Sequence, residues 1–107
     1  MRRILSLLLL VGTSLPCHAR CRFDQVVGYT LVAKKTVIGF IQDDKRGDEF
    51  AGCDFGRILI FEDNTGVRCT GYNYTYSYRP DAYLFVNASH NIRVCIEDEW
   101  FDVASLR

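Results

Sequence analysis

Several features that would suggest a specific chemistry are scarce in this sequence. It has one tryptophan, two prolines and two histidines in 107 residues, and its thirteen basic residues are balanced by thirteen acidic ones. A balanced charge gives no electrostatic case for nucleic-acid binding, which would call for a basic patch. Beyond the N-terminal region only His90 remains for acid–base or metal chemistry. We therefore assign no catalytic residue, and we predict no metal, no cofactor and no nucleic-acid partner.

Long apolar runs are also absent, except at the N-terminus. Two arginines precede an apolar run from Ile4 to Val11, and small residues follow up to Ala19. This order of charged, apolar and small regions is typical of a secretory signal peptide, and the run is shorter than the ~20 residues that a membrane-spanning helix needs. We predict a signal peptide at residues 1–19 and a single mature domain at residues 20–107. The mature chain would then have no transmembrane span and a periplasmic or secreted location.

Two alternatives for the N-terminus are a retained membrane anchor and a lipid attached at a cysteine. Pro16 precedes Cys17 and Arg20 precedes Cys21, whereas a lipid-attachment signal needs a small residue there. The cleaved signal peptide therefore remains the favoured interpretation.

Cysteines are the most informative residues that the chain does contain. Four would remain after removal of the leader: Cys21, Cys53, Cys69 and Cys95. An even number in an exported chain predicts two disulfides, which a domain this small needs to supplement its core. Zinc is the alternative, but no CxxC spacing supports it. Of the three possible connectivities we favour Cys53–Cys69 with Cys21–Cys95, because these bonds would tie a polar loop and the N-terminus to later strands.

The remainder of the chain favours short antiparallel strands over helices. It is rich in β-branched and aromatic residues and is divided by turn residues at short intervals. We predict strands at 26–33, 36–41, 57–62, 67–72, 82–87, 92–96 and 99–103. Turns between them are expected at 63–66, at 89–91 and at Asp98–Glu99, where Asn, Asp and Gly tolerate positive φ.

A closed sheet follows from two further patterns. The runs 58–61 and 83–86 do not alternate cleanly between apolar and polar residues, which predicts strands covered on both faces. Gly28 and Gly39 lie inside strand patterns and would permit sharp bends. We predict an all-β, disulfide-stapled domain, a small antiparallel barrel or strongly curved sheet of about six or seven short strands.

The longest polar stretch, residues 42–56, is predicted to be a loop. Its carboxylates, Asp44 and Asp48 among them, suggest a calcium site, but their spacing does not follow the EF-hand order and adjacent basic residues offset their charge. A solvated loop is the favoured interpretation.

The most distinctive feature is a row of tyrosines at every second position: Tyr72, Tyr74, Tyr76 and Tyr78. In an extended segment all four rings would project from one side. They would form either an exposed surface that stacks on a sugar or a partner protein, or a half-buried barrel wall with Asn73, Thr75 and Ser77 facing water. We favour the barrel wall as the default.

One resemblance can be named from these residues. The stretch Gly39 to Phe61, with its acidic loop and Gly52-Cys53, is followed by Cys69, the tyrosine-rich segment and Ile96-Glu97-Asp98-Glu99. In this it resembles a group of small exported bacterial proteins of unknown function. The resemblance implies a periplasmic or secreted location and no particular activity.

Together these patterns predict a monomeric, non-catalytic binding or inhibitor module. Its tyrosine row and the loop acids Asp44 and Asp48 would contact a cell-envelope protein or glycan. The alternatives are a small periplasmic hydrolase that uses loop carboxylates or His90, and a structural component of the envelope.

Overall fold

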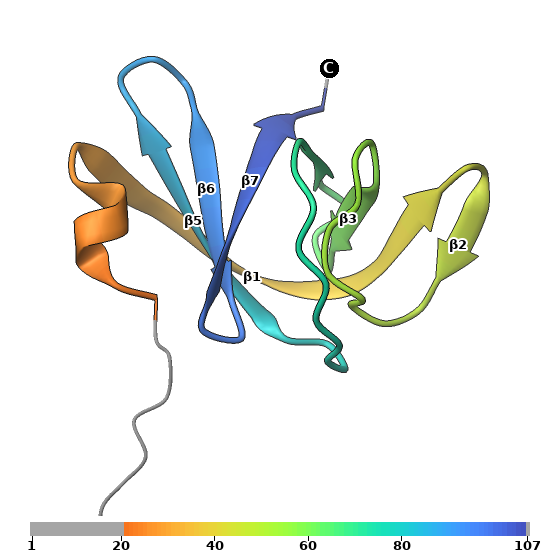
Figure 1. Ribbon diagram of the computed structural model, residues 1–107. Helices are drawn as coiled ribbons and strands as arrows, with labels where there is room; N and C mark the ends of the chain where they lie inside the picture. Colours follow the sequence, from red (N-terminus) through yellow and green to blue (C-terminus); the bar gives the residue numbers. More distant parts are fainter. Residues whose placement is uncertain (1–20, 107) are drawn as a thin grey trace, which may run out of the picture.

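Antiparallel strands account for nearly all of the regular structure (Figure 1). The computed structural model describes residues 21–106, so the predicted signal peptide lies outside the described residues. The elements are a 3-10 helix η1 (Phe23–Val26) and the strands β1 (Tyr29–Gln42), β2 (Lys45–Gly47), β3 (Ile58–Phe61), β4 (Gly66–Cys69), β5 (Asp81–Asn87), β6 (Ile92–Ile96) and β7 (Glu99–Ser105). No helix among residues 21–106 is long and apolar enough to cross a membrane.

The sheet closes on itself because its longest strand has neighbours at both ends of the order. The strands follow the order β2-β1-β3-β4-β7-β6-β5, and β1 also pairs with β5. The first part of β1, Tyr29–Thr36, pairs with β5, and its second part, from Val37 to Ile41, pairs with β3. The strands β1, β3, β4, β7, β6 and β5 therefore form a closed barrel, with β2 as an additional strand. The predicted fold class is confirmed.

Irregular pairing allows β1 to bend between its two partners. The register shifts between Leu31 and Ala33 and again between Val37 and Gly39. A Cβ atom on Gly39 would lie 2.4 Å from the carbonyl oxygen of Gly47, so only glycine fits where β2 approaches. The prediction of a bend at Gly39 is confirmed, and bulges are a usual means of curving a strand in a barrel.

Several predicted boundaries were wrong. The turn predicted at Asp98–Glu99 lies at Glu97–Asp98, because Glu99 already pairs with Ile96 as the first residue of β7. Most of the segments 26–33 and 36–41 forms one strand, because Lys34 and Lys35 continue the pairing with β5. This strand begins only at Tyr29, since Val26 ends η1 and Gly28 lies in the turn that follows rather than inside a strand. The loop 42–56 contains β2, since Asp43 and Asp44 both have positive φ and make the two-residue turn that joins it to β1. The strand predicted at 67–72 ends at Cys69, where the chain leaves the barrel.

The core is a single cluster of buried apolar side chains from all the barrel strands. Its largest fully buried members are Phe50, Phe61, Phe101, Leu59, Ile96, Val37 and Val94. The Cys53–Cys69 disulfide belongs to the core, with its two cysteines 2% and 1% exposed. Cys21 bonds Cys95 and ties the N-terminal end to β6. The favoured connectivity is confirmed.

Candidate functional site in the tyrosine segment

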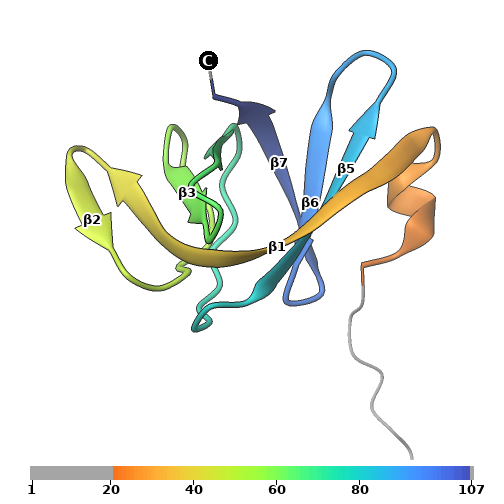
Figure 2. The same ribbon diagram turned by 180° about the vertical axis from the view of Figure 1, so that it is seen from behind.

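The tyrosines lie on the connection between β4 and β5, here named the tyrosine segment (residues 71–79; Figure 2). This segment runs antiparallel to residues 50–53. Phe50 and Ser77 exchange two backbone hydrogen bonds of 2.9 Å, and Cys53 and Asn73 exchange two of 2.7 and 3.0 Å. The two stretches therefore form a short ribbon beside the barrel, although neither contains a regular strand.

The partner stretch, residues 50–53, is anchored in the core. Phe50 is fully buried and packs edge-on against Phe101, with ring centroids 5.4 Å apart. Cys53 is held by its disulfide to the end of β4. The tyrosine segment is thus supported by backbone hydrogen bonds to a stretch that is anchored in the core.

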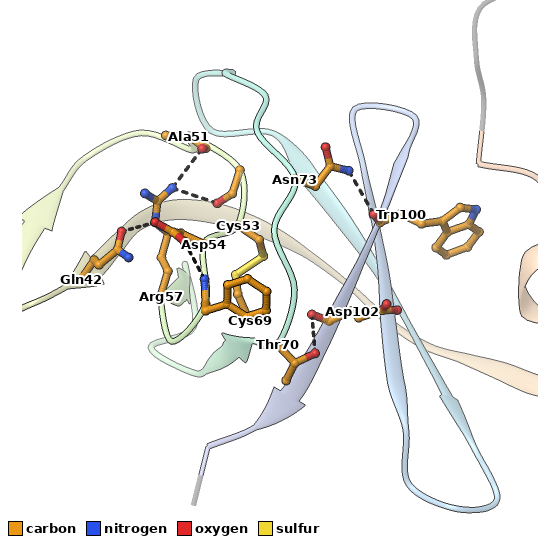
Figure 3. Close-up of a disulfide and its surroundings, with 12 residues drawn as sticks. Gln42, Ala51, Cys53, Asp54, Arg57, Cys69, Thr70, Asn73, Trp100 and Asp102 are labelled. Carbon is orange, nitrogen blue, oxygen red and sulfur yellow. Dashed lines mark hydrogen bonds between the residues drawn. A yellow bond between two sulfur atoms is a disulfide. The ribbon is translucent and has the colours of Figure 1, made fainter.

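Arg57 also holds this stretch in place (Figure 3). Its Nη1 donates to the carbonyl oxygens of Ala51 and Gly52 at 2.9 and 3.2 Å, and its Nε donates to Gln42 Oε1 at 2.9 Å. The guanidinium lies 4.5 Å from the ring centroid of Phe40. Sequence reasoning missed this role, because nothing in the local pattern shows that Arg57 reaches back across six residues of loop.

The small polar residues of the segment face the protein. Asn73 Nδ2 donates to the Trp100 carbonyl oxygen at 3.3 Å, and Ser77 Oγ donates to a Glu97 carboxylate oxygen at 2.7 Å. Just before the segment, Thr70 donates from its N–H and its hydroxyl to the Asp102 carbonyl oxygen, both at 3.0 Å (Figure 3). These bonds orient one face of the segment toward β7 and the β6–β7 turn.

The four tyrosines face solvent. Tyr72, Tyr74, Tyr76 and Tyr78 are 64%, 66%, 66% and 69% exposed, whereas the residues between them are half-buried. The favoured barrel-wall interpretation was therefore wrong. The predicted alternation of the segment was right, but the side that faces solvent was reversed. The ribbon lies outside the barrel sheet, and nothing else in residues 21–106 covers the tyrosine rings.

The row ends at a cation. The Arg79 guanidinium lies 5.5 Å from the ring centroid of Tyr78, and its Nε donates to the Tyr78 hydroxyl at 3.2 Å. No carboxylate of residues 21–106 pairs with Arg79. The exposed row is therefore uncharged along its length and basic at one end.

The loop acids Asp44 and Asp48 belong to the stretch around β2 and not to the tyrosine segment itself. Asp44 is in the exposed β1–β2 turn, and Asp48 follows β2, with an oxygen 3.9 Å from Arg46 Nε. A hollow of about 420 Å³ beside this hairpin is lined by Phe40, Gln42, Asp43, Lys45, Arg46 and Asp54. Figure 1 and Figure 2 both place the β1–β2 hairpin to one side of the tyrosine segment. The structure thus places Asp44, at the tip of this hairpin, away from the tyrosines. Asp48 is closer to them, because it lies two residues before Phe50, whose backbone bonds to Ser77 of the tyrosine segment.

The residues named for hydrolysis are not assembled either. His90 is exposed in the β5–β6 turn with a φ of 68°. A second hollow, of about 320 Å³, reaches Asn91, Arg93 and Asp102 but not His90. Within the described residues no group of three or more His, Cys, Asp or Glu side chains is arranged to hold a metal ion.

Comparison with known proteins adds no relative. No protein-family model, curated protein sequence or solved structure gives a significant match to this chain. The resemblance to exported bacterial proteins therefore stays a prediction.

Proposed function

We propose that this protein is an exported, monomeric, non-catalytic binding module whose tyrosine segment contacts a protein or glycan of the cell envelope. The observation that carries the proposal is the outward direction of all four tyrosines on a supported backbone. A tyrosine offers broad apolar area with a polar tip and only two side-chain torsions to order, so a row of them binds at low entropic cost. Four such rings side by side are more than the scattered exposed apolar residues of an ordinary surface.

Export is supported by the bonding of the cysteines. Both disulfides, Cys21–Cys95 and Cys53–Cys69, form between residues that a reducing cytoplasm would keep as thiols. Intact mass spectrometry of protein purified from its natural compartment, before and after reduction, tests this part. A chain that starts at Arg20 with two disulfides is expected, and free thiols or an uncleaved leader would contradict export.

Binding is tested with the double variant Tyr74→Ala/Tyr76→Ala. The wild-type and variant proteins are immobilised, and capture of components from cell-envelope extract is compared. Part of the extract is treated with protease and part with periodate, which destroys glycans. We expect a component that the wild type retains and the variant loses.

The matched control is Phe23→Ala, because Phe23 is 79% exposed but lies in η1, away from the tyrosine segment (Figure 1). This control should retain the component. If the double variant captures the same components as the wild type, the tyrosine segment is not the binding surface.

A further inference from the structure

We propose that the outer edge of the tyrosine segment binds an extended strand of a partner polypeptide through backbone hydrogen bonds. This inference rests on the proposed function and specifies its partner class as polypeptide rather than glycan. The mode is β-strand addition, in which main-chain bonds supply affinity and alternate side chains supply specificity.

The first argument is the direction of the backbone groups. In an extended chain, successive residues turn their N–H and C=O groups to opposite edges. Asn73 and Ser77 use theirs on Cys53 and Phe50, so the intervening Tyr74 and Tyr76 turn theirs to the other edge. Over residues 21–106, the backbone groups of the four tyrosines take part in no hydrogen bond with the protein. The segment therefore presents an alternating set of free donors and acceptors.

The second argument is that this edge lacks protection. Proteins usually guard an exposed edge with charged residues, with proline or by keeping the strand short. Within residues 21–106, β2 also has an open edge, but this strand has only three residues, two of them Lys45 and Arg46. From residue 71 to residue 78 the tyrosine segment contains no charged residue and no proline. The tyrosine segment therefore lacks the features that prevent an exposed edge from pairing with another chain.

The side chains along this edge indicate which side chains a partner strand should carry. Tyrosine rings at every second position favour uncharged, apolar side chains opposite them, because charged groups would lose hydration there. At the end of the row, Arg79 contacts Tyr78 and pairs with no carboxylate of the described chain. An acidic side chain near one end of the partner strand would complement it.

A glycan fits this edge less well than a polypeptide. Sugar rings stack on aromatic faces, which accounts for the tyrosine side chains but not for the row of free backbone groups. A polypeptide strand has the same spacing of donors and acceptors as the segment it pairs with. A polypeptide strand would therefore contact the tyrosine rings and pair with the free backbone groups at the same time.

The test starts from a phage-displayed library of random twelve-residue peptides. The library is selected on the disulfide-bonded wild-type protein and counter-selected on Tyr74→Ala/Tyr76→Ala. We expect enriched peptides with apolar residues at alternate positions and an acidic residue near one end. In the complex with a synthetic copy of an enriched peptide, hydrogen exchange of the Tyr74 and Tyr76 amides should slow at least ~10-fold, because both N–H groups become hydrogen-bonded.

Two single variants distinguish the contribution of the Tyr74 ring to binding from that of its backbone N–H group. Tyr74→Ala removes the ring and keeps the N–H, whereas Tyr74→Pro removes both. Under strand addition Tyr74→Pro should bind the peptide roughly three- to tenfold more weakly than Tyr74→Ala, which corresponds to one lost hydrogen bond. The exchange measurement on the wild type decides the matter if Tyr74→Pro does not fold.

Failure of this inference is distinguishable from failure of the proposed function. If no peptide is enriched, or if a bound peptide leaves exchange of the Tyr74 and Tyr76 amides unchanged, strand addition is wrong. A glycan recovered in the envelope experiment and lost on Tyr74→Ala would leave the binding function standing with a different ligand. Loss of no component at all in that experiment would overturn both.

Discussion

Gly52 lies directly against the backbone of Asn73, and a Cβ atom built on Gly52 would be 2.3 Å from the Asn73 carbonyl oxygen. The same atom would be 2.7 Å from the Thr75 nitrogen, and Gly52 has a φ of 81°. The tyrosine segment can therefore approach residues 50–53 only because position 52 has no side chain.

This contact predicts that Gly52→Ala destabilises the protein more than Gly56→Ala does. Gly56 has nearly the same φ, 82°, but nothing lies within 4 Å of its Cβ position. Gly56→Ala should cost about 1 kcal/mol for the left-handed conformation alone, and Gly52→Ala a further ~1–3 kcal/mol for the clash. Urea unfolding of both variants with intact disulfides measures the difference. An equal loss of unfolding free energy in the two variants would mean that the tyrosine segment shifts away from residue 52 at little energetic cost.

The tyrosine rings should contribute little to stability. Tyr74→Ala/Tyr76→Ala removes two side chains that are each 66% exposed, so the free energy of unfolding should change by no more than about 0.5 kcal/mol per residue. Phe50→Ala, on the partner stretch, removes a fully buried ring and should cost about 3–5 kcal/mol. Thermal unfolding of the two proteins gives the comparison. A large loss in the tyrosine variant would favour a structural role for the row.

The two disulfides should stabilise the protein by different amounts. Cys53→Ala/Cys69→Ala opens a link over 16 residues and should cost about 3 kcal/mol in chain entropy. Cys21→Ala/Cys95→Ala opens a link over 74 residues and should cost about 4 kcal/mol by the same relation. Denaturant titration of each double variant measures the free energy of unfolding. The reverse order would indicate that loss of core packing around Cys53 outweighs loop length.

Asp63 should show an acid titration well below that of an ordinary aspartate. Hydrogen bonds from the Thr65 hydroxyl, from Lys35 and from the Thr65 N–H lower the pKa of Asp63 from 3.8 to about 2. A lowered folded-state pKa means that the stabilisation is complete above about pH 4 and is lost as the pH falls toward 2. NMR titration of the Asp63 carboxyl carbon measures the value.

The hydroxyl of Thr65 is the largest cause of this shift, and two variants isolate it. In Thr65→Ala the pKa of Asp63 should rise toward 3.8, whereas in Thr65→Ser, which keeps the hydroxyl, it should stay near 2. A pKa that is unchanged in Thr65→Ala would assign the effect to Lys35 instead.

Arg57 should not be replaceable by lysine. Its planar guanidinium reaches Gln42, Ala51 and Gly52 and lies over Phe40, a geometry that a single ammonium cannot reproduce. Arg57→Lys should destabilise the protein by about 1–3 kcal/mol. Arg68→Lys, on the exposed face of β4, is the control and should be nearly neutral. The same small effect in both would show that the Arg57 hydrogen bonds contribute little.

Local chemistry decided much of the fold and was visible in the sequence. The turns at 63–66 and 89–91 contain Asn64 and His90 at positive φ, and the apolar segments between turns became strands. An even set of cysteines predicted two disulfides, and alternation predicted that the four tyrosines share one side. These features depend on residues close in the chain, or on the redox chemistry of cysteine alone.

Other features depend on what lies opposite each segment, which only the tertiary structure decides. Lys34 and Lys35 continue β1 because β5 pairs with them, although their charge suggests a break. The tyrosines face outward because β7 and the β6–β7 turn lie on the opposite face of the segment, where the Asn73 and Ser77 side chains bond to them. Alternation by itself cannot choose between the two directions. The period of the row is a property of the extended backbone, whereas its exposure is a property of the barrel beside it.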